Sequence, residues 1–174
     1  MTHQTALELI QAALPTHPQK WGDLGAGTGL FTEVLCDHLP IGSEVYALDK
    51  SPHMLWKLPS PDRVPFHIVD ADFTRSLPEL PVCEGILMAN ALHYVEQPTE
   101  VLPKILDKLS AGGTFVLIEY DIHQALPPYI PYPIPWQSWP ALCRSVGLSE
   151  PQLLHAVPSR YGHDRIYSAS CVKL

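Results

Sequence analysis

Three glycines in five residues, in the segment Gly25-Ala26-Gly27-Thr28-Gly29, are the first feature that could bind a ligand. Glycine has no Cβ atom, so this segment can turn tightly and bring its backbone close to a ligand. Apolar residues on both sides predict a strand before the turn and a helix after it. That helix would offer unpaired N–H groups and the positive end of its dipole. The alternative is a tight strand–helix connection without a ligand.

Polar side chains follow the next three predicted strands. Asp49 ends the second strand, twenty residues beyond Gly29, where its carboxylate can accept hydrogen bonds from both hydroxyls of a ribose. Asp72 follows the third strand, where it can accept a hydrogen bond from the exocyclic amine of a base. Asn90 follows the fourth strand and can face the reacting end of the ligand. Because ligands bind outside the carboxyl ends of parallel strands, these residues predict a nucleoside-like cofactor across those ends.

The glycine pattern differs from the NAD fingerprint. That fingerprint has a glycine three residues after the second glycine, where this chain has Leu30. Asp23, which precedes the turn, would repel a pyrophosphate but would stabilise an ammonium or sulfonium group. An NAD-dependent dehydrogenase therefore stays only as an alternative, and the chain has no convincing Tyr-Lys pair for hydride transfer.

Taken together, these segments resemble the class I S-adenosylmethionine-dependent methyltransferases. Asp23-Leu24-Gly25-Ala26-Gly27-Thr28-Gly29 is similar to the first motif of that family, and Asp49 falls at its ribose-binding acid. Ile68-Val69-Asp70-Ala71-Asp72-Phe73 resembles the adenine-binding segment. Met88-Ala89-Asn90-Ala91-Leu92-His93-Tyr94 is similar to the segment that lines the methionine end, and Gly112-Gly113-Thr114-Phe115 to the turn into the fifth strand.

The resemblance implies S-adenosyl-L-methionine as the cofactor and gives individual residues a role. Asp23 would face the methionine part, Asp72 would contact the adenine amino group, and Phe73 would supply the backbone contact beside it. Asp70 is the alternative to Asp72 if the alignment slips. The residues implied for the cofactor site are Asp23, Gly25, Ala26, Gly27, Thr28, Gly29, Asp49, Lys50, Met54, Asp72, Phe73 and Asn90.

Two features depart from the family pattern. Gly22 stands where the first strand usually has a large apolar residue. The Asn/Asp-Pro-Pro-aromatic motif of base aminomethyltransferases is missing, because Ala91 and Leu92 follow Asn90. The sequence therefore does not identify the methyl acceptor or the methylated atom.

His93, just past the fourth strand, is the first candidate for a catalytic residue on the acceptor side, as a general base. The alternative is that it caps or packs the start of a helix. Tyr94 could pack on the cofactor, but we expect it to fill the core. Four residues after the fifth strand could line an acceptor pocket, although each is expected to be solvated rather than catalytic: Glu119, Tyr120, Asp121 and His123.

The proline-rich segment 126–139 carries four large aromatic residues: Tyr129, Tyr132, Trp136 and Trp139. One hypothesis is that it forms a stiff aromatic lid over the acceptor. The alternative is a structural loop that covers an edge of the sheet.

The elements that must position these residues alternate between strand and helix. Helices are predicted over residues 6–14, 30–39, 53–58, 101–109 and 136–146, and strands up to residue 24 and over 45–48, 66–69, 85–89, 114–118, 152–157 and 166–172. No helix fits between the last two strands, so we expect them to pair antiparallel. The pattern predicts a single α/β domain over residues 1–174, with a Rossmann-like, doubly wound, mostly parallel seven-stranded sheet and an antiparallel last strand.

Composition narrows the class of partner. The chain has 18 acidic and 11 basic residues, a net charge of −7 and no basic run, so nucleic acid is a poor partner. Its four cysteines lie far apart without CxxC spacing, which favours free thiols in the cytoplasm and no metal site. No signal peptide or membrane-spanning stretch is expected.

The leading functional hypothesis is methyl transfer to a small molecule, because the chain is compact and has no separate recognition domain. A non-catalytic protein that senses S-adenosylmethionine, or a partner subunit, is an alternative. Protein or RNA acceptors are further options, and the acidic charge disfavours RNA. The sequence does not indicate an oligomeric state.

Overall fold

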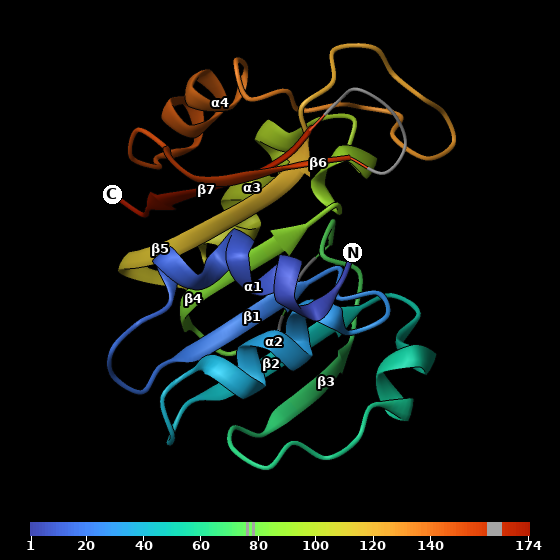
Figure 1. Ribbon diagram of the computed structural model, residues 1–174. Coiled ribbons are helices and arrows are strands. Elements are labelled where there is room, and N and C mark those ends of the chain that lie inside the picture. Colours follow the sequence, from blue (N-terminus) through green and yellow to red (C-terminus); the bar gives the residue numbers. More distant parts are fainter. Residues whose placement is uncertain (76, 78, 160–164) are drawn as a thin grey trace.

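All the strands of the chain join one mixed sheet, seen in a computed structural model that describes residues 1–75, 77, 79–159 and 165–174 (Figure 1). The strand order is β3-β2-β1-β4-β5-β7-β6. The strands are β1 (Lys20–Leu24), β2 (Glu44–Asp49), β3 (Phe66–Asp70), β4 (Cys83–Ala89), β5 (Leu109–Tyr120), β6 (Gln152–Pro158) and β7 (Arg165–Val172). β7 runs antiparallel to both of its neighbours, and the other pairings are parallel. The predicted sheet is confirmed.

Helices cover both faces of this sheet (Figure 1). They are α1 (His3–Ile10), α2 (Leu30–His38), α3 (Pro98–Leu106) and α4 (Trp139–Val146), with 3-10 helices η1 (Gln11–Ala13), η2 (Pro52–Lys57) and η3 (Leu92–Tyr94). α1 and α2 pack on one face, and α3 and α4 on the other. Their ends follow local chemistry: Gly29, with φ +88°, precedes α2, Pro98 opens α3, and Gly147, with φ +83°, ends α4.

Some predicted boundaries are wrong. The helix expected over 101–109 ends at Leu106, and Leu109 already belongs to β5. The glycine pair expected to turn the chain lies inside β5, because the Gly112 N–H donates to the Lys173 carbonyl and the Lys173 N–H donates to the Gly113 carbonyl. The segment expected as a helix over 53–58 is the 3-10 helix η2, and α4 begins at Trp139 rather than at residue 136. The predicted link between β6 and β7 includes residues 160–164, which lie outside the described residues.

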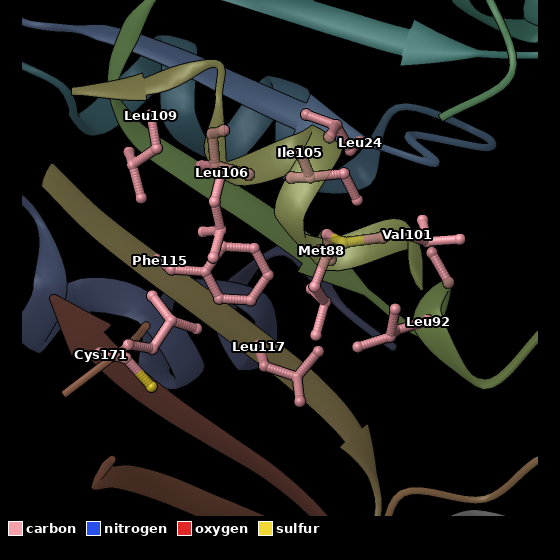
Figure 2. Packing of buried hydrophobic residues seen from close by; sticks show 14 of the residues in the cluster. Leu24, Met88, Leu92, Val101, Ile105, Leu106, Leu109, Phe115, Leu117 and Cys171 are labelled. Atoms are coloured by element: carbon pink, nitrogen blue, oxygen red, sulfur yellow. The ribbon is translucent and has the colours of Figure 1, made fainter. Parts of the chain in front are cut away.

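The sheet separates two apolar clusters. Figure 2 shows Leu106 of α3 lying against Phe115 of β5, and Ile105 and Leu117 belong to the same cluster. Such packing stabilises the fold by about 1.5–3 kcal/mol for each large apolar side chain that is fully buried. On the opposite face, α1 and α2 pack against a cluster that includes the fully buried Trp21 of β1. The sheet thus carries the polar residues at its edge between two packed apolar layers.

The glycine at position 22 does not leave a gap in the packing around β1. A Cβ atom built there would lie 2.9 Å from the Leu24 Cδ1 atom and within 4 Å of Ile86 and Leu80. Neighbouring side chains therefore fill the space that a larger residue would take. The departure from the family pattern is compensated by the packing around it.

Strands β1 to β5 run parallel, so their carboxyl ends lie along one edge of the sheet. Among the described residues, no helix is long and apolar enough to cross a membrane. The polar side chains predicted from the sequence follow the carboxyl ends of these parallel strands.

Candidate functional site

The end of β2 holds the glycine turn, residues 25–29, in place. The Asp49 Oδ2 atom accepts a hydrogen bond of 2.8 Å from the Gly27 N–H, and its Oδ1 atom accepts one of 2.8 Å from the Ser51 N–H. The Leu48 carbonyl accepts from the N–H groups of Gly25 (2.8 Å) and Ala26 (3.0 Å). The sequence placed a turn and a carboxylate near each other, and the structure joins them directly.

Gly25 is required for steric reasons as well as for its backbone conformation. Its φ is +76°, a region that other residues rarely adopt. A Cβ atom at this position would lie 2.6 Å from the Ala91 Cβ atom and 3.3 Å from the Phe73 ring. The turn therefore touches the segments that follow β3 and β4, and these three segments form one surface.

A cavity of about 500 Å³, here called the turn cavity, opens at this surface. Its volume is in the range of small-molecule sites. The described residues that line it are Gly25, Gly27, Asp49, Lys50, Asp72, Phe73, Thr74, Asn90, Ala91, Tyr94 and Val95. Seven of the predicted cofactor residues are among them. Five others do not line it: Asp23, Ala26, Thr28, Gly29 and Met54.

Of the two aspartates after β3, the structure brings Asp72 to the turn cavity. Asp70 lies opposite Asp49 in the β2–β3 register, and it is exposed and does not line the cavity. The Asp72 Oδ1 atom accepts hydrogen bonds from the Thr74 N–H (2.9 Å) and hydroxyl (2.7 Å). These bonds hold the pKa of Asp72 below its usual value and keep it an anionic acceptor at neutral pH.

Asp23 lies beneath the turn rather than in the cavity. It is buried, and its Oδ2 atom accepts a hydrogen bond of 2.7 Å from the Thr32 hydroxyl of α2. Burial raises the pKa of Asp23 to about 7, the Thr32 hydrogen bond opposes this shift, and the nearby negative charge of Asp49 adds to it. Asp23 thus carries a carboxyl group that changes charge near neutral pH.

Asn90 lies where the strand ends meet. Its φ is +50°, a positive value that asparagine tolerates better than most residues, and its N–H donates to the Ile118 carbonyl at 2.8 Å. Its Oδ1 atom is buried and has no hydrogen-bond partner among the described residues. A buried, unpaired amide oxygen costs about 1–3 kcal/mol, so this atom is suited to accept a hydrogen bond from a ligand.

A second cavity of about 600 Å³, here called the aromatic cavity, adjoins the first. The described residues that line it are Asn90, His93, Tyr94, Tyr120, Ile122, Leu126, Tyr129, Ile130 and Ser159. Asn90 and Tyr94 belong to both cavities. Tyr94 is 56% exposed, so the prediction that it fills the core is wrong. Its position in η3 turns its ring outward between the two cavities.

His93 and Glu119 form a buried pair at the wall of the aromatic cavity. The His93 Nδ1 atom lies 2.6 Å from the Glu119 Oε2 atom, and the Glu119 Oε1 atom accepts from the His93 backbone N–H at 3.1 Å. The two side chains are only 2% and 1% exposed. The expectation that Glu119 is solvated is wrong, because η3 covers the end of β5. The sequence held one signal for this pair: Glu119 directly follows the apolar run 114–118, and the neighbouring strand β4 leads to Asn90.

Asp121 is also structural rather than solvated. Its Oδ1 atom accepts from the Trp136 backbone N–H at 2.8 Å, and its Oδ2 atom accepts from the Arg165 Nε at 2.8 Å. This carboxylate therefore ties the segment 126–139 to the first residue of β7.

The segment 126–139 divides into two parts. Leu126, Tyr129 and Ile130 line the aromatic cavity, and Tyr129 is 76% exposed. Trp139, by contrast, is fully buried, with its ring centroid 6.1 Å from that of Phe115. The lid hypothesis therefore applies to the first part only, since Trp139 belongs to the core.

A comparison of this sequence with known protein families also points to the residues at the strand ends. Residues 23–115, more than half of the chain, match the family described as methyltransferase domain. The chain belongs to this methyltransferase family. The matched region of this methyltransferase-domain protein contains the glycine turn, Asp49, Asp72, Asn90 and His93, whereas Glu119 lies beyond it.

Individual relatives agree with this family. Trans-aconitate 2-methyltransferase from Pseudomonas aeruginosa is 32% identical over 119 residues, which cover 65% of this chain and 40% of that protein. The chain thus spans less than half the length of the curated relative that it matches.

Solved structures share the fold. A Burkholderia thailandensis 1,6-didemethyltoxoflavin-N1-methyltransferase with bound S-adenosylhomocysteine has a TM-score of 0.72 at 19% identity, over 98% of this chain and 76% of that one. A SAM-dependent methyltransferase from Aquifex aeolicus has a TM-score of 0.68 at 13% identity and covers 100% of both chains. In this methyltransferase-domain protein, no group of three or more His, Cys, Asp or Glu that could hold a metal occurs among the described residues.

Proposed function

We propose that this protein binds S-adenosyl-L-methionine in the turn cavity and transfers its methyl group to a small molecule held in the aromatic cavity. One observation carries this function above all: two cavities of about 500 and 600 Å³ meet at Asn90 and Tyr94. A donor in one and an acceptor in the other would have their reacting ends at this junction. Methyl transfer requires that kind of in-line contact between two bound molecules.

The residues of the turn cavity fit the cofactor. Each oxygen of Asp49 accepts one backbone hydrogen bond and keeps a lone pair, so this carboxylate is able to hold ribose hydroxyls. Asp72 is an anionic acceptor for an adenine amino group, with the backbone of Phe73 beside it. The unpaired Oδ1 atom of Asn90 suits the ammonium group of the methionine part. Asp23 would act from beneath the turn, through charge rather than contact.

The bound sulfonium supplies a methyl group that is already activated. The chain therefore has mainly to orient the two partners, which can lower a barrier by about 7–11 kcal/mol. His93 faces the acceptor side, where we assign it the role of general base for acceptors that must lose a proton. An acceptor that is already ionised would not need it.

The volume of the aromatic cavity suits a small molecule. The curated relative is itself named for a small acid, trans-aconitate. The net charge of −7 disfavours nucleic acid as acceptor. All four cysteines are buried and free, which supports a location in the reducing cytoplasm. We also propose that the whole chain acts as one domain.

Calorimetry with S-adenosylmethionine, S-adenosylhomocysteine and NAD tests the cofactor. We expect the first two to bind and NAD not to bind; tight binding of NAD alone would contradict the proposal. Transfer of a labelled methyl group to a small-molecule extract then tests the reaction. Binding without transfer to any compound would favour the alternative of a sensor or partner subunit.

A further inference from the structure

The residues that line the aromatic cavity indicate the chemical class of the acceptor. We propose that the acceptor is an uncharged aromatic or heteroaromatic molecule whose methylated oxygen or nitrogen bears an ionisable proton, and that Glu119 positions His93 to remove this proton. This inference rests on the proposed function, because it names the substrate class of the same site.

The described lining favours a flat, largely apolar ligand. The side chains that surround the cavity are mainly aromatic or aliphatic: Tyr94, Tyr120, Ile122, Leu126, Tyr129 and Ile130. Two of these rings flank the imidazole of His93, whose centroid lies 4.4 Å from that of Tyr94 and 6.3 Å from that of Tyr120. Aromatic rings at such spacings prefer offset or tilted contacts with other rings. A planar acceptor would thus lie among rings, with its polar atom beside His93.

Charge at the cavity disfavours an anionic acceptor. The buried carboxylate of Glu119 lies directly behind His93, and no Lys or Arg occurs among the described lining residues. A di- or tricarboxylate would therefore be buried near a like charge, with no cationic partner among the described lining residues, which is costly. A tricarboxylate such as trans-aconitate fits these described residues poorly.

The contacts of His93 hold its orientation. The Nδ1 atom lies 2.6 Å from the Glu119 Oε2 atom, so a proton on Nδ1 is donated to this carboxylate, and in the neutral imidazole the lone pair is then on Nε2. The backbone is also held, because the His93 N–H donates to Glu119 at 3.1 Å and the His93 carbonyl accepts from the Tyr132 N–H at 3.0 Å. The Nε2 atom has no hydrogen bond within the described part of the chain, and the ring lines the cavity. Nε2 is thus the atom that would meet the acceptor.

The step balances in atoms and charge. A bond forms between the acceptor oxygen or nitrogen and the methyl carbon while the carbon–sulfur bond breaks, and the electron pair of that bond stays on sulfur. The acceptor proton goes to His93 Nε2, and the Glu119 carboxylate stabilises the imidazolium. The proton then leaves to solvent. His93 is the catalytic residue in this proposal, and Glu119 is a positioning residue.

A binding experiment without cofactor tests the acceptor class. 4-Nitrophenol and 7-hydroxycoumarin are titrated into the full chain at a pH below the solution pKa of each probe, with trans-aconitate as the anionic competitor. We expect at least one probe to bind with its absorbance shifted toward the ionised form, and trans-aconitate not to displace it. Binding of trans-aconitate with no binding of either probe would overturn the proposal.

Variants of the pair test the proton transfer. His93→Gln should still bind the probe but lose the shift to the ionised form, and Glu119→Gln should reduce the shift. Glu150→Gln, an equivalent change at an exposed ion pair with Arg144, is the control and should behave as wild type. An unchanged shift in both His93→Gln and Glu119→Gln would refute their role. Circular dichroism checks that each variant is folded.

The proposal also predicts that the loss of kcat in Glu119→Gln depends on the ionisation state of the acceptor. With a weakly acidic phenol as acceptor, Glu119→Gln should lower kcat by about 100-fold, the lower end of what general-base catalysis contributes, while the affinity for S-adenosylmethionine stays unchanged. With an acceptor that is fully ionised at the assay pH, kcat should fall much less. Equal losses on both acceptors would contradict the positioning role. Failure to bind S-adenosylmethionine would instead refute the proposed function, since the probe titrations do not contain it.

Discussion

The carboxylate of Asp49 lies 2.8 Å from the Gly27 N–H, so the residue at the tip of β2 holds the glycine turn that follows β1. The same side chain also accepts from the Ser51 N–H at 2.8 Å. Asp49 therefore shapes the turn cavity in addition to lining it. This double role makes the consequences of replacing it specific.

Asp49→Ala should weaken binding of S-adenosylmethionine by at least about tenfold. It removes a charged acceptor worth about 1.5–3 kcal/mol, and it also frees the Gly27 N–H that shapes the turn. Calorimetry of the variant measures the loss. Asp70→Ala is the matched control, because Asp70 pairs with Asp49 in register but is exposed outside the cavity. Normal affinity in Asp49→Ala, or an equal loss in Asp70→Ala, would contradict the ribose assignment.

Gly25→Ala should both destabilise the fold and weaken cofactor binding. The new Cβ atom would meet Ala91 at 2.6 Å and Phe73 at 3.3 Å, in a backbone conformation that alanine disfavours. Gly112→Ala separates these effects, because Gly112 has a similar φ of +72° but nothing within 4 Å of its Cβ position. We expect the control to lose about 1 kcal/mol of unfolding free energy and no cofactor affinity. Similar losses in the two variants would mean that the contact with Ala91 is unimportant.

Asp23 should make stability depend on pH. Its pKa is about 7 in the folded protein and about 3.9 in an unfolded chain, so between those values the folded state binds a proton that the unfolded state lacks. This contribution to the unfolding free energy falls as pH rises from about 4 to about 7. Asp23→Asn removes it, and its amide oxygen can still accept from Thr32.

The measurement is chemical denaturation of wild type and Asp23→Asn across this pH range. As pH rises from the acidic to the neutral end of this range, the unfolding free energy of the variant should increase by up to about 4 kcal/mol relative to that of wild type. Asp70→Asn, which changes an exposed carboxylate, should show no such gain. Parallel curves for wild type and Asp23→Asn would contradict the raised pKa.

Much of the lining of the turn cavity could be predicted because its residues are signalled locally. The glycine turn, Asp49, Asp72 and Asn90 each follow an apolar strand, and parallel strands bring such ends to one edge. Asp23 shows where this reasoning stops: its distance along the chain from the turn is short, yet its side chain points into the interior toward Thr32.

The acceptor side was harder to predict because it depends on contacts between distant segments. Glu119 is buried, and its partner His93 comes from η3, the segment that follows β4. Trp139 looks like its aromatic neighbours in the proline-rich segment, but it packs on Phe115 in the core. Replacing Trp136 and Trp139 together would therefore test folding as much as a lid.

Tyr129 provides the cleaner test of the segment as a cover for the acceptor. Tyr129→Ala should raise the KM for the acceptor several-fold, because this side chain lines the aromatic cavity, and it should change the unfolding free energy by no more than about 0.5 kcal/mol, because it is 76% exposed. Tyr132→Ala is the matched control: Tyr132 belongs to the same segment but is not among the described residues that line the cavity, and its N–H keeps its hydrogen bond to the His93 carbonyl whatever the side chain. Acceptor kinetics at saturating S-adenosylmethionine, with denaturation curves for both variants, make the comparison. If Tyr129→Ala leaves KM unchanged, or if Tyr132→Ala raises it equally, the first part of the segment is only a structural loop.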